Sequence, residues 1–325
     1  MSPVKTAYGT IKGEVTDRQL LFYRQIGEGG VGAIITEPMS VLPNGREHPK
    51  QVRIEDDKFI DELKKITDVI HQTGALAIGH LNHAGRAANP KVINDTPFAP
   101  CEVSCASTGA TARKMTIEEI DEVISAFGKA AKRLEEANFD AVEIQMGHGY
   151  LIAQFLSPHI NKRDDKYGED PLLFARRVIE TVKEATDLPI NVRISGSEFL
   201  PEGLSPNNLE PLISLLEDSG VNAIHVGFGN ACDSPPWYYG HMAMPEEPQL
   251  EVFEKIRELT SLPLIASGRM GDPDKIEKVL DIGYNGIALG RSLIADPQFV
   301  NKFEADKKDE ILFCGRCLQG CLVKV

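Results

Sequence analysis

The sequence has no long apolar run and no cluster of basic residues. None of its hydrophobic stretches approaches the roughly 20 residues that a membrane-spanning helix needs. The longest basic block is Lys307-Lys308, and the 325 residues carry a net charge of −13, which argues against nucleic acid or an anionic membrane as the main partner. Met1-Ser2-Pro3 is followed by Lys5 and Tyr8 rather than by the apolar stretch of a signal peptide, so we expect a cytoplasmic protein.

Cysteine is sparse, with six residues placed unevenly along the chain. A disulfide scaffold is not expected in a chain of this length, so we expect a reducing compartment and interpret Cys101 and Cys105 as ordinary thiols. Cys232 is expected in another loop at the working end of the barrel. Cys101 and Cys105 have the spacing of half a metal site, but no second half lies near them in the sequence.

A glycine-rich dinucleotide fingerprint is also missing, because Ala7-Tyr8-Gly9 after the first predicted strand does not supply one. This argues against a doubly wound sheet. Apolar segments that alternate with helical stretches instead indicate parallel strands covered by helices. We therefore predict a single (β/α)8 TIM barrel over residues 1–300, followed by a cysteine-containing segment, residues 301–325. The predicted strands are 1–5, 32–37, 75–80, 141–145, 190–195, 223–227, 262–267 and 286–289, and the predicted helices include 17–27, 58–73, 116–137 and 172–186.

Polar residues follow the predicted strands at the end where barrel enzymes carry their chemistry. Gln145, His148 and Tyr150 come directly after the fourth strand, and a histidine with a tyrosine there indicates proton transfer. Ser267-Gly268-Arg269 and Gly290-Arg291 end the seventh and eighth strands, where barrels bind phosphate through backbone N–H groups.

The stretch HGYLIAQFLSPHINKRDDKYG, residues 148–168, resembles the signature of the old yellow enzyme family of flavin-dependent ene-reductases. Within that family it is most similar to the branch of bacterial 2,4-dienoyl-CoA reductase. The resemblance implies an FMN-dependent oxidoreductase in which hydride passes from flavin N5 to an activated C=C bond. Tyr150 would protonate the α-carbon while His148 and Gln145 hold the activating carbonyl. Gln145 departs from the His or Asn of most relatives.

The resemblance also implies which residues contact FMN. They are Pro3, Val4, Lys5, Thr6, Glu37, His80, Arg193, Ser267, Gly268, Arg269, Gly290 and Arg291. Two of these depart from the family pattern. His80 replaces a glutamine and is expected to donate to the flavin pyrimidine edge. Lys5 replaces Thr, Cys or His, and either lies near the ring as a cation or points to solvent while Thr6 makes the contact.

Two long loops are expected at the mouth of the barrel. Residues 89–115 have the length of a lid or binding element. Residues 231–244 contain Trp237, Tyr238 and Tyr239, which either form a substrate wall or pack locally. The implied partners are NAD(P)H or an external electron donor and a small unsaturated molecule; a homo-oligomer is left open.

Cys314, Cys317 and Cys321 have C-x2-C-x3-C spacing, which is typical of an iron–sulfur site more than of zinc. The resembling branch completes a [4Fe-4S] cluster with a fourth cysteine further on, which this sequence lacks. A cluster with another fourth ligand, a truncated reductase, and vestigial thiols are the three interpretations, and we favour an incomplete site.

Two other functions stay open at this point. A phosphate-binding barrel of another class, such as an isomerase or aldolase, would need a catalytic lysine or acid pair, and Lys5 is the one such candidate. A non-catalytic, truncated reductase fragment is the third hypothesis.

Overall fold

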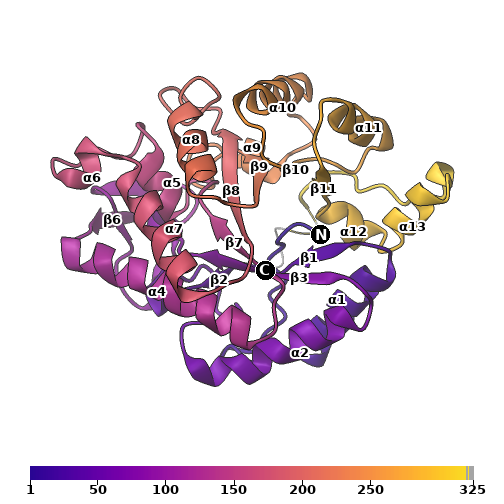
Figure 1. The fold of residues 1–325 in the computed structure, drawn as a ribbon, viewed down its shortest axis with the longest axis horizontal. Helices are drawn as coiled ribbons and strands as arrows, with labels where there is room; N and C mark the ends of the chain where they lie inside the picture. The colour runs from indigo at the N-terminus through magenta and orange to yellow at the C-terminus, as the bar shows by residue number, and fades with distance from the viewer. Residues whose placement is uncertain (320, 322–325) are drawn as a thin grey trace.

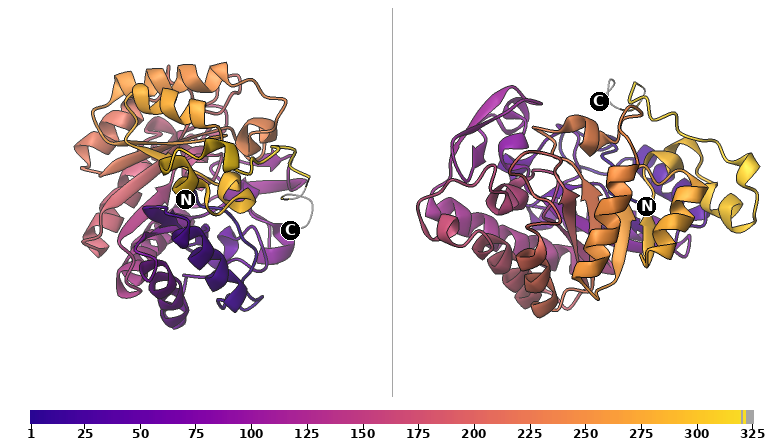
Figure 2. Two further views of the ribbon diagram at one scale, coloured as in Figure 1. Left: turned by 90° about the vertical axis from the view of Figure 1, so that its right-hand side faces the viewer. Right: turned by 90° about the horizontal axis from the view of Figure 1, so that it is seen from above.

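Parallel strands form the centre of the molecule and helices surround them (Figures 1 and 2). The structure is a computed structural model that describes residues 1–319 and 321. Seven strands pair in the order β1-β3-β7-β8-β9-β10-β11, and the short β2 (Met39–Ser40) pairs with β3. Their bounds are β1 Ala33–Ile35, β3 Leu76–Asn82, β7 Ala141–Gln145, β8 Ile190–Ser197, β9 Ala223–Phe228, β10 Leu264–Ser267 and β11 Gly286–Ala288.

Irregular residues at the start of the chain fill the eighth position of the barrel. The backbone N–H of Ser2 donates to Leu289 O after β11 (2.7 Å), and Ile35 N of β1 donates to Met1 O (3.1 Å). Pro3 has no N–H to continue this ladder, so the expected strand over residues 1–5 was wrong as a strand. The predicted TIM barrel is nevertheless confirmed, and the doubly wound alternative is excluded.

The outer helices each turn an apolar stripe toward the strands. In α4, the buried residues Ile120, Val123, Phe127 and Leu134 recur at the three- and four-residue spacing of one helix face. None of the helices in the described part of the chain combines the length and apolarity needed to cross a bilayer. The larger helices are α1 Asp17–Glu28, α2 Ile60–His71, α4 Ile117–Glu136, α7 Leu173–Ala185, α8 Glu210–Asp218, α10 Glu247–Leu259 and α11 Pro273–Asp281.

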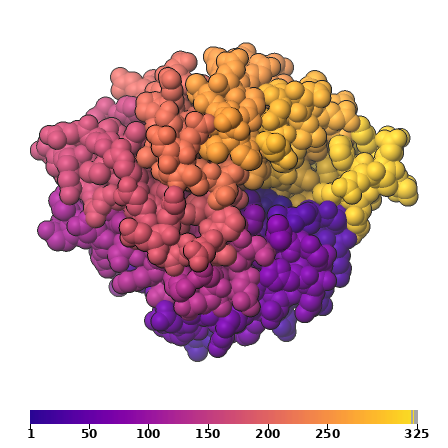
Figure 3. Space-filling model, viewed as in Figure 1, coloured from indigo at the N-terminus to yellow at the C-terminus, as the bar shows by residue number. Residues whose placement is uncertain are grey.

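The sequence segments follow one another around the molecule, so the first and last parts of the barrel become neighbours. The space-filling view runs from the indigo start of the chain around to the yellow C-terminal part, which lies beside it (Figure 3).

Shorter helices sit at the loop positions between the larger elements. They are α5 Leu151–Leu156, α6 Lys166–Glu169, α9 Pro235–Tyr239, α12 Arg291–Ala295 and α13 Phe299–Glu304, with single 3-10 turns at Pro43–Gly45, Asp57–Phe59, Gly85–Ala87 and Lys308–Glu310.

Residues 89–115, which were expected to form a long loop, contain regular secondary structure. They contain α3 (Pro90–Ile93) and a separate small sheet of β4 (Phe98–Ala99), β5 (Val103–Cys105) and β6 (Ala110–Lys114). In the antiparallel β5–β6 pair, Ser104 lies opposite Thr111 and their hydroxyls are 2.9 Å apart. Strands of two to five residues are too short to show a clear alternation, which explains why the sequence did not reveal them.

We predict that Thr116→Ala destabilises the fold through α4 alone. The Thr116 hydroxyl accepts from Glu119 N (3.3 Å) and the Glu119 carboxylate accepts from Thr116 N (2.9 Å), which is the capping box expected from the sequence. Losing it should lower the free energy of unfolding by ~1 kcal/mol. Urea denaturation measures the change, and Thr116→Ser, which keeps the hydroxyl, is the control. An unchanged midpoint in Thr116→Ala would contradict the assignment.

Candidate active site

The carboxyl end of β7 and the short loop after it carry Gln145, His148 and Tyr150, and all three side chains are buried. Gln145 is the last residue of β7, and Tyr150 is the N-cap of α5. The side-chain oxygen of Gln145 accepts from Gly147 N (3.1 Å) and lies 3.4 Å from His148 Nδ1. The amide nitrogen of Gln145 is therefore the end that is left to donate to a ligand.

His148 is held in an uncommon backbone conformation. Its φ is 60°, in the left-handed region that few residues other than glycine adopt. The backbone N–H donates to Ser195 Oγ on β8 (2.7 Å), and the Ser195 hydroxyl donates onward to Gly229 O (3.0 Å). A Cβ atom on Gly227 would lie 2.6 Å from His148 Nε2, so the ring fits there only against glycine. Burial and the nearby Arg193 hold the pKa of His148 well below its usual range, so the imidazole is neutral.

The Tyr150 hydroxyl has two polar neighbours from distant segments. Its Oη lies 2.7 Å from Tyr238 Oη of α9 and 2.9 Å from Lys5 Nζ. Lys5 also forms an ion pair with Glu47. Burial, followed by the carboxylate of Glu47, raises the pKa of Tyr150 well above its usual range, so the phenol is protonated. Lys5 therefore contacts the expected proton donor, which neither sequence interpretation of this residue included.

Two residues of this cluster, Glu47 and Tyr238, were missed as site residues. Glu47 carried no signal, because it lies in a loop far from the strand-end motifs. Tyr238 belongs to the aromatic segment that we noted, and its ring also lies edge-on to His148, with centroids 5.3 Å apart. Trp237 instead stacks on Phe199 at 3.9 Å, so local packing is the correct interpretation for that side chain.

A buried carboxylate lies between two imidazoles inside the barrel. Glu143 of β7 is 2.7 Å from His80 Nδ1 on β3 and 2.7 Å from His225 Nδ1 on β9, and all three side chains are fully buried. Burial opposes ionisation of Glu143, but the two histidines outweigh it and hold its pKa well below the usual range. Burial lowers the pKa of His80, and that of His225 to about 4.

This arrangement fixes the tautomer of both rings. A neutral imidazole that donates from Nδ1 to a carboxylate carries a lone pair at Nε2. Both Nε2 atoms are buried and lack a hydrogen-bond partner among the described residues. His80 thus presents an acceptor to a ligand, whereas the sequence analysis expected a donor.

Arg193 and the ends of β10 and β11 supply half-buried cations. Arg193 on β8 pairs in register with Gln145 and His225, and its Nε is without a partner in the described chain. Arg269 bonds Met244 O and Glu246, while Arg291 donates to Gly240 O (3.1 Å). Among the residues that the structure describes, Arg269 Nε and one terminal nitrogen of Arg291 have no hydrogen-bond partner. Buried donors of this kind suit an anionic ligand.

Lys275 of α11 is another cation at this end of the barrel, and its side chain is buried. Its ammonium donates to Gln249 Oε1 (2.8 Å) and to Gly268 O (3.2 Å), so it fixes the glycine that precedes Arg269. Burial lowers the pKa of Lys275 to about 8. No strand-end motif contains it, so the sequence gave no indication of this role.

The remaining expected FMN contacts lie in the first segment and on β1's exit loop. Glu37 accepts from Thr6 N (3.2 Å) and the Thr6 hydroxyl (3.3 Å), and also from Gln19. Burial raises the pKa of Glu37 to about 7. Its side chain therefore anchors the first segment rather than pointing to a ligand. Val4 lies beside Gly290, so Pro3 and Val4 approach the β11 end of the site.

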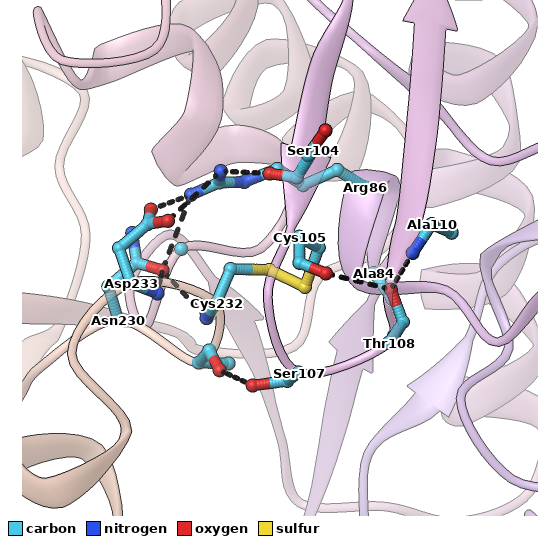
Figure 4. Close-up of a disulfide and its surroundings, with 12 residues drawn as sticks. Ala84, Arg86, Ser104, Cys105, Ser107, Thr108, Ala110, Asn230, Cys232 and Asp233 are labelled. Atoms are coloured by element: carbon cyan, nitrogen blue, oxygen red, sulfur yellow. Dashed lines mark hydrogen bonds and ion pairs between the residues drawn. A yellow bond between two sulfur atoms is a disulfide. The ribbon is translucent and has the colours of Figure 1, made fainter.

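Cys105 and Cys232 form a disulfide, so the interpretation of Cys105 as an ordinary thiol was wrong (Figure 4). Cys105 ends β5 and Cys232 follows β9, and both pack in one apolar cluster with Tyr150. The buried guanidinium of Arg86 lies beside the bridge, where it pairs with Asp233 and donates to Ser104 O (2.8 Å). A disulfide gives no support to the expected reducing compartment, whereas Cys101 remains free.

The predicted iron–sulfur ligands are not brought together. Among the described residues, which include Cys314, Cys317 and Cys321, no group of three or more His, Cys, Asp or Glu side chains could hold a metal ion. Arg316 between them is instead held by Glu246 (2.6 Å), the partner of Arg269. Thiolates converge on a cluster only when the metal compensates their mutual repulsion, so the spacing alone did not determine this geometry. Residues 320 and 322–325 of the predicted segment lie outside the described residues.

Comparison with known proteins gives the class of this barrel. Residues 1–310 match the model of the NADH:flavin oxidoreductase / NADH oxidase family. The chain is 34% identical over 330 residues to an NADH oxidase of Thermoanaerobacter brockii, covering 99% of this chain and 50% of that protein. It is 34% identical over 295 residues to an NADPH dehydrogenase of Clostridium acetobutylicum, covering 89% and 84%. A 2-naphthoyl-CoA reductase complex superposes with a TM-score of 0.91 at 24% identity, over 98% of this chain and 52% of that one.

The chain therefore belongs to the NADH:flavin oxidoreductase family, as the signature over residues 148–168 predicted. This confirms the predicted family, to which a phosphate-binding barrel of another class does not belong. The chain spans about half the length of the first curated relatives that it matches, at 50% and 48%.

The residues at the barrel's carboxyl end fit FMN. The unsatisfied nitrogens of Arg269 and Arg291 suit a phosphate, which accepts hydrogen bonds from guanidinium groups. Farther along the sheet, the lone pair of His80 and the guanidinium of Arg193 suit a heterocycle with both an N–H group and acceptor atoms. The two unsatisfied sets thus match the two polar ends of the cofactor.

We predict that Arg291→Ala and Arg193→Ala weaken FMN binding by different routes. Arg291 should act on the phosphate, so its loss should reduce FMN affinity but leave riboflavin affinity nearly unchanged. Arg193 should act on the ring, so its loss should weaken both ligands. Fluorescence titration of the apoprotein measures all four affinities, and Arg24→Ala on the exposed side of α1 is the matched control. Equal losses of FMN and riboflavin affinity in Arg291→Ala would contradict the phosphate assignment.

The buried histidines predict acid sensitivity of the ligand-free protein. Burial lowers the pKa of His225 to about 4 and that of His83 to about 3, from the usual 6.5. Below pH 6.5 the unfolded chain therefore binds protons that the folded chain does not. As the pH is lowered below 6.5, the free energy of unfolding should decrease by up to ~1.4 kcal/mol per pH unit for each histidine. Urea midpoints between pH 7 and 5 measure the slope.

The matched variants for this experiment are His83→Gln and His159→Gln. His83 is buried against Phe98 and accepts from Gly85 N, whereas His159 is exposed. His83→Gln should reduce the change in the free energy of unfolding per pH unit by the contribution of one histidine, and His159→Gln should leave it unchanged. An equal slope in the wild type and His83→Gln would show that the His83 ring is protonated in the folded state.

Proposed function

We propose that this chain is an FMN-dependent reductase of activated C=C bonds in which Tyr150 is the proton donor. The observation that carries the proposal is the convergence of Tyr150, His148 and Gln145 at the end of β7. Tyr150 is 1% exposed and protonated, and it lies within one turn of two side chains that can bind a carbonyl oxygen. A proton donor beside a carbonyl-binding pair suits addition of hydrogen across a conjugated double bond.

Each side chain has a distinct task in this proposal. Gln145 donates from its amide nitrogen and His148 from a ring N–H to the substrate carbonyl, which stabilises negative charge as it develops on that oxygen. Because burial keeps His148 neutral, its ring has a single N–H to donate to the carbonyl. Tyr150 delivers its phenolic proton to the α-carbon. FMN, when bound, supplies hydride to the β-carbon; Arg269 and Arg291 would hold its phosphate, and His80 and Arg193 its ring edge.

A nicotinamide dinucleotide is the proposed electron donor. The relatives named NADH oxidase and NADPH dehydrogenase support this choice, since both names imply reduction by a nicotinamide. The proposed second substrate is a small unsaturated carbonyl compound. A visible absorption spectrum of the purified protein tests the foundation, because a folded chain that binds no added FMN would contradict the proposal and favour a non-catalytic fragment.

We predict that Tyr150→Phe separates the two half-reactions. Reduction of bound FMN by NAD(P)H should proceed at the wild-type rate, while reoxidation by an enone should slow ~100- to 10,000-fold through loss of the general acid. Anaerobic stopped-flow absorbance measures both steps. Tyr284→Phe is the matched control, because Tyr284 is a buried tyrosine that precedes β11 at the opposite end of the barrel and donates to Phe253 O. Reoxidation of Tyr150→Phe at the wild-type rate would show that another group supplies the proton.

A further inference from the structure

Lys5 is a cation placed directly against the hydroxyl of the proposed proton donor. Its Nζ lies 2.9 Å from Tyr150 Oη and 5.3 Å from the centre of the Tyr150 ring. Tyr150 itself is 1% exposed, whereas the side chains of Lys5 and Glu47 are 35% and 12% exposed. The ammonium of Lys5 and the carboxylate of Glu47 therefore connect the buried phenol of Tyr150 to solvent.

The chemistry of an ammonium group sets the direction of these hydrogen bonds. A lysine ammonium has three N–H donors and no acceptor, so Lys5 must donate to the Tyr150 oxygen. The Tyr150 proton then points to another acceptor: Tyr238 Oη at 2.7 Å, the Glu47 carboxylate, or a substrate. The contact thus leaves the phenolic proton free to be given away.

We propose that Lys5, supported by Glu47, stabilises the Tyr150 phenolate and returns a proton to it after each turnover. This inference rests on the proposed function of Tyr150. When the Tyr150 O–H bond breaks and its proton joins the substrate α-carbon, the phenolate is left opposite the Lys5 ammonium. A Lys5 N–H proton passes to the phenolate oxygen, and the neutral amine regains a proton from solvent. One solvent proton is consumed in each cycle, and no oxidant or reductant is needed.

The electrostatics of the cluster favour this role. A buried phenolate without a nearby cation is costly, and burial accordingly raises the pKa of Tyr150. Burial alone would lower the pKa of Lys5, but Glu47 outweighs it and raises that pKa, so the cation is charged at neutral pH. The titratable groups around Lys5 are Glu47, His48, Tyr150, Tyr238 and Tyr239.

Lys5 acts through Tyr150 and is therefore a positioning residue, which a double-mutant cycle tests. Reoxidation of the FMN-loaded, reduced enzyme by an enone is measured in wild type, Lys5→Met, Tyr150→Phe and the double variant. Lys5→Met should slow this step by ~10-fold or more, and by less than the ~100- to 10,000-fold expected for Tyr150→Phe. In the Tyr150→Phe background, Lys5→Met should change the rate by less than about twofold, because the two side chains share one function.

Chemical rescue separates proton return from a structural ion pair. In Lys5→Ala, added ethylammonium should restore steady-state turnover, whereas tetramethylammonium should not, because it has the same charge but no N–H group. Steady-state turnover of the unrescued variant should also fall as pH rises from 7 to 9, while the wild type stays level. Lys5→Arg, which keeps a donor cation, should retain more activity than Lys5→Met.

The outcomes distinguish this inference from the function on which it rests. If Tyr150→Phe reacts at the wild-type rate, the proposed function fails. If Tyr150→Phe is slow but Lys5→Met is not, or if the two losses multiply in the double variant, the role of Lys5 fails and that of Tyr150 stands. Rescue by both ammonium ions would overturn proton return and leave Lys5 a purely electrostatic role.

Discussion

The barrel interior depends on one buried carboxylate, Glu143, which contacts the imidazole rings of His80 and His225. A lone buried carboxylate would be strongly destabilising, so the pair of imidazole N–H donors is what permits it at the centre of the sheet. Because the three side chains come from β3, β7 and β9, this contact also fixes the relative positions of three strands. The same contact sets the tautomers, and so decides which atoms face a ligand.

The polar groups around this carboxylate divide the carboxyl end of the barrel into two regions. At β7 and its neighbours, His148 and Tyr150 are neutral and buried, which suits proton donation to a substrate. At β10 and β11, Arg269 and Arg291 leave cationic donors unsatisfied within the described chain, which suits a permanently charged phosphate. Arg193 on the intervening β8 lies between the two regions. The order of strands in the sheet thus separates cofactor anchoring from acid–base chemistry.

Local patterns allowed the fold and part of the candidate site to be predicted. The bounds of β7 and the capping box at Thr116 follow from a few consecutive residues, and the strand-end motifs identified Tyr150, His148 and Arg291. The contact of Lys5 with Tyr150 joins residues 145 apart, and the disulfide joins residues 127 apart. Such pairings depend on the register of the whole barrel, which no short stretch of sequence contains. The same reason explains why the role of Glu47 and the pairing of Glu143 with His80 and His225 were not foreseen.

The Cys105–Cys232 bridge makes a covalent ring of the central part of the chain. This ring contains α4, β7, α7, β8 and β9, while β1, β3, β10 and β11 lie on the two tails outside it. In the chain-entropy account, closing a loop of this size restricts the unfolded state by about 5 kcal/mol. An oxidised chain therefore begins to fold as a loop that already encloses the strand of Tyr150 and Glu143, and the two tails complete the barrel from either side. The oxidation state of two thiols thus determines the topology of the polymer that folds.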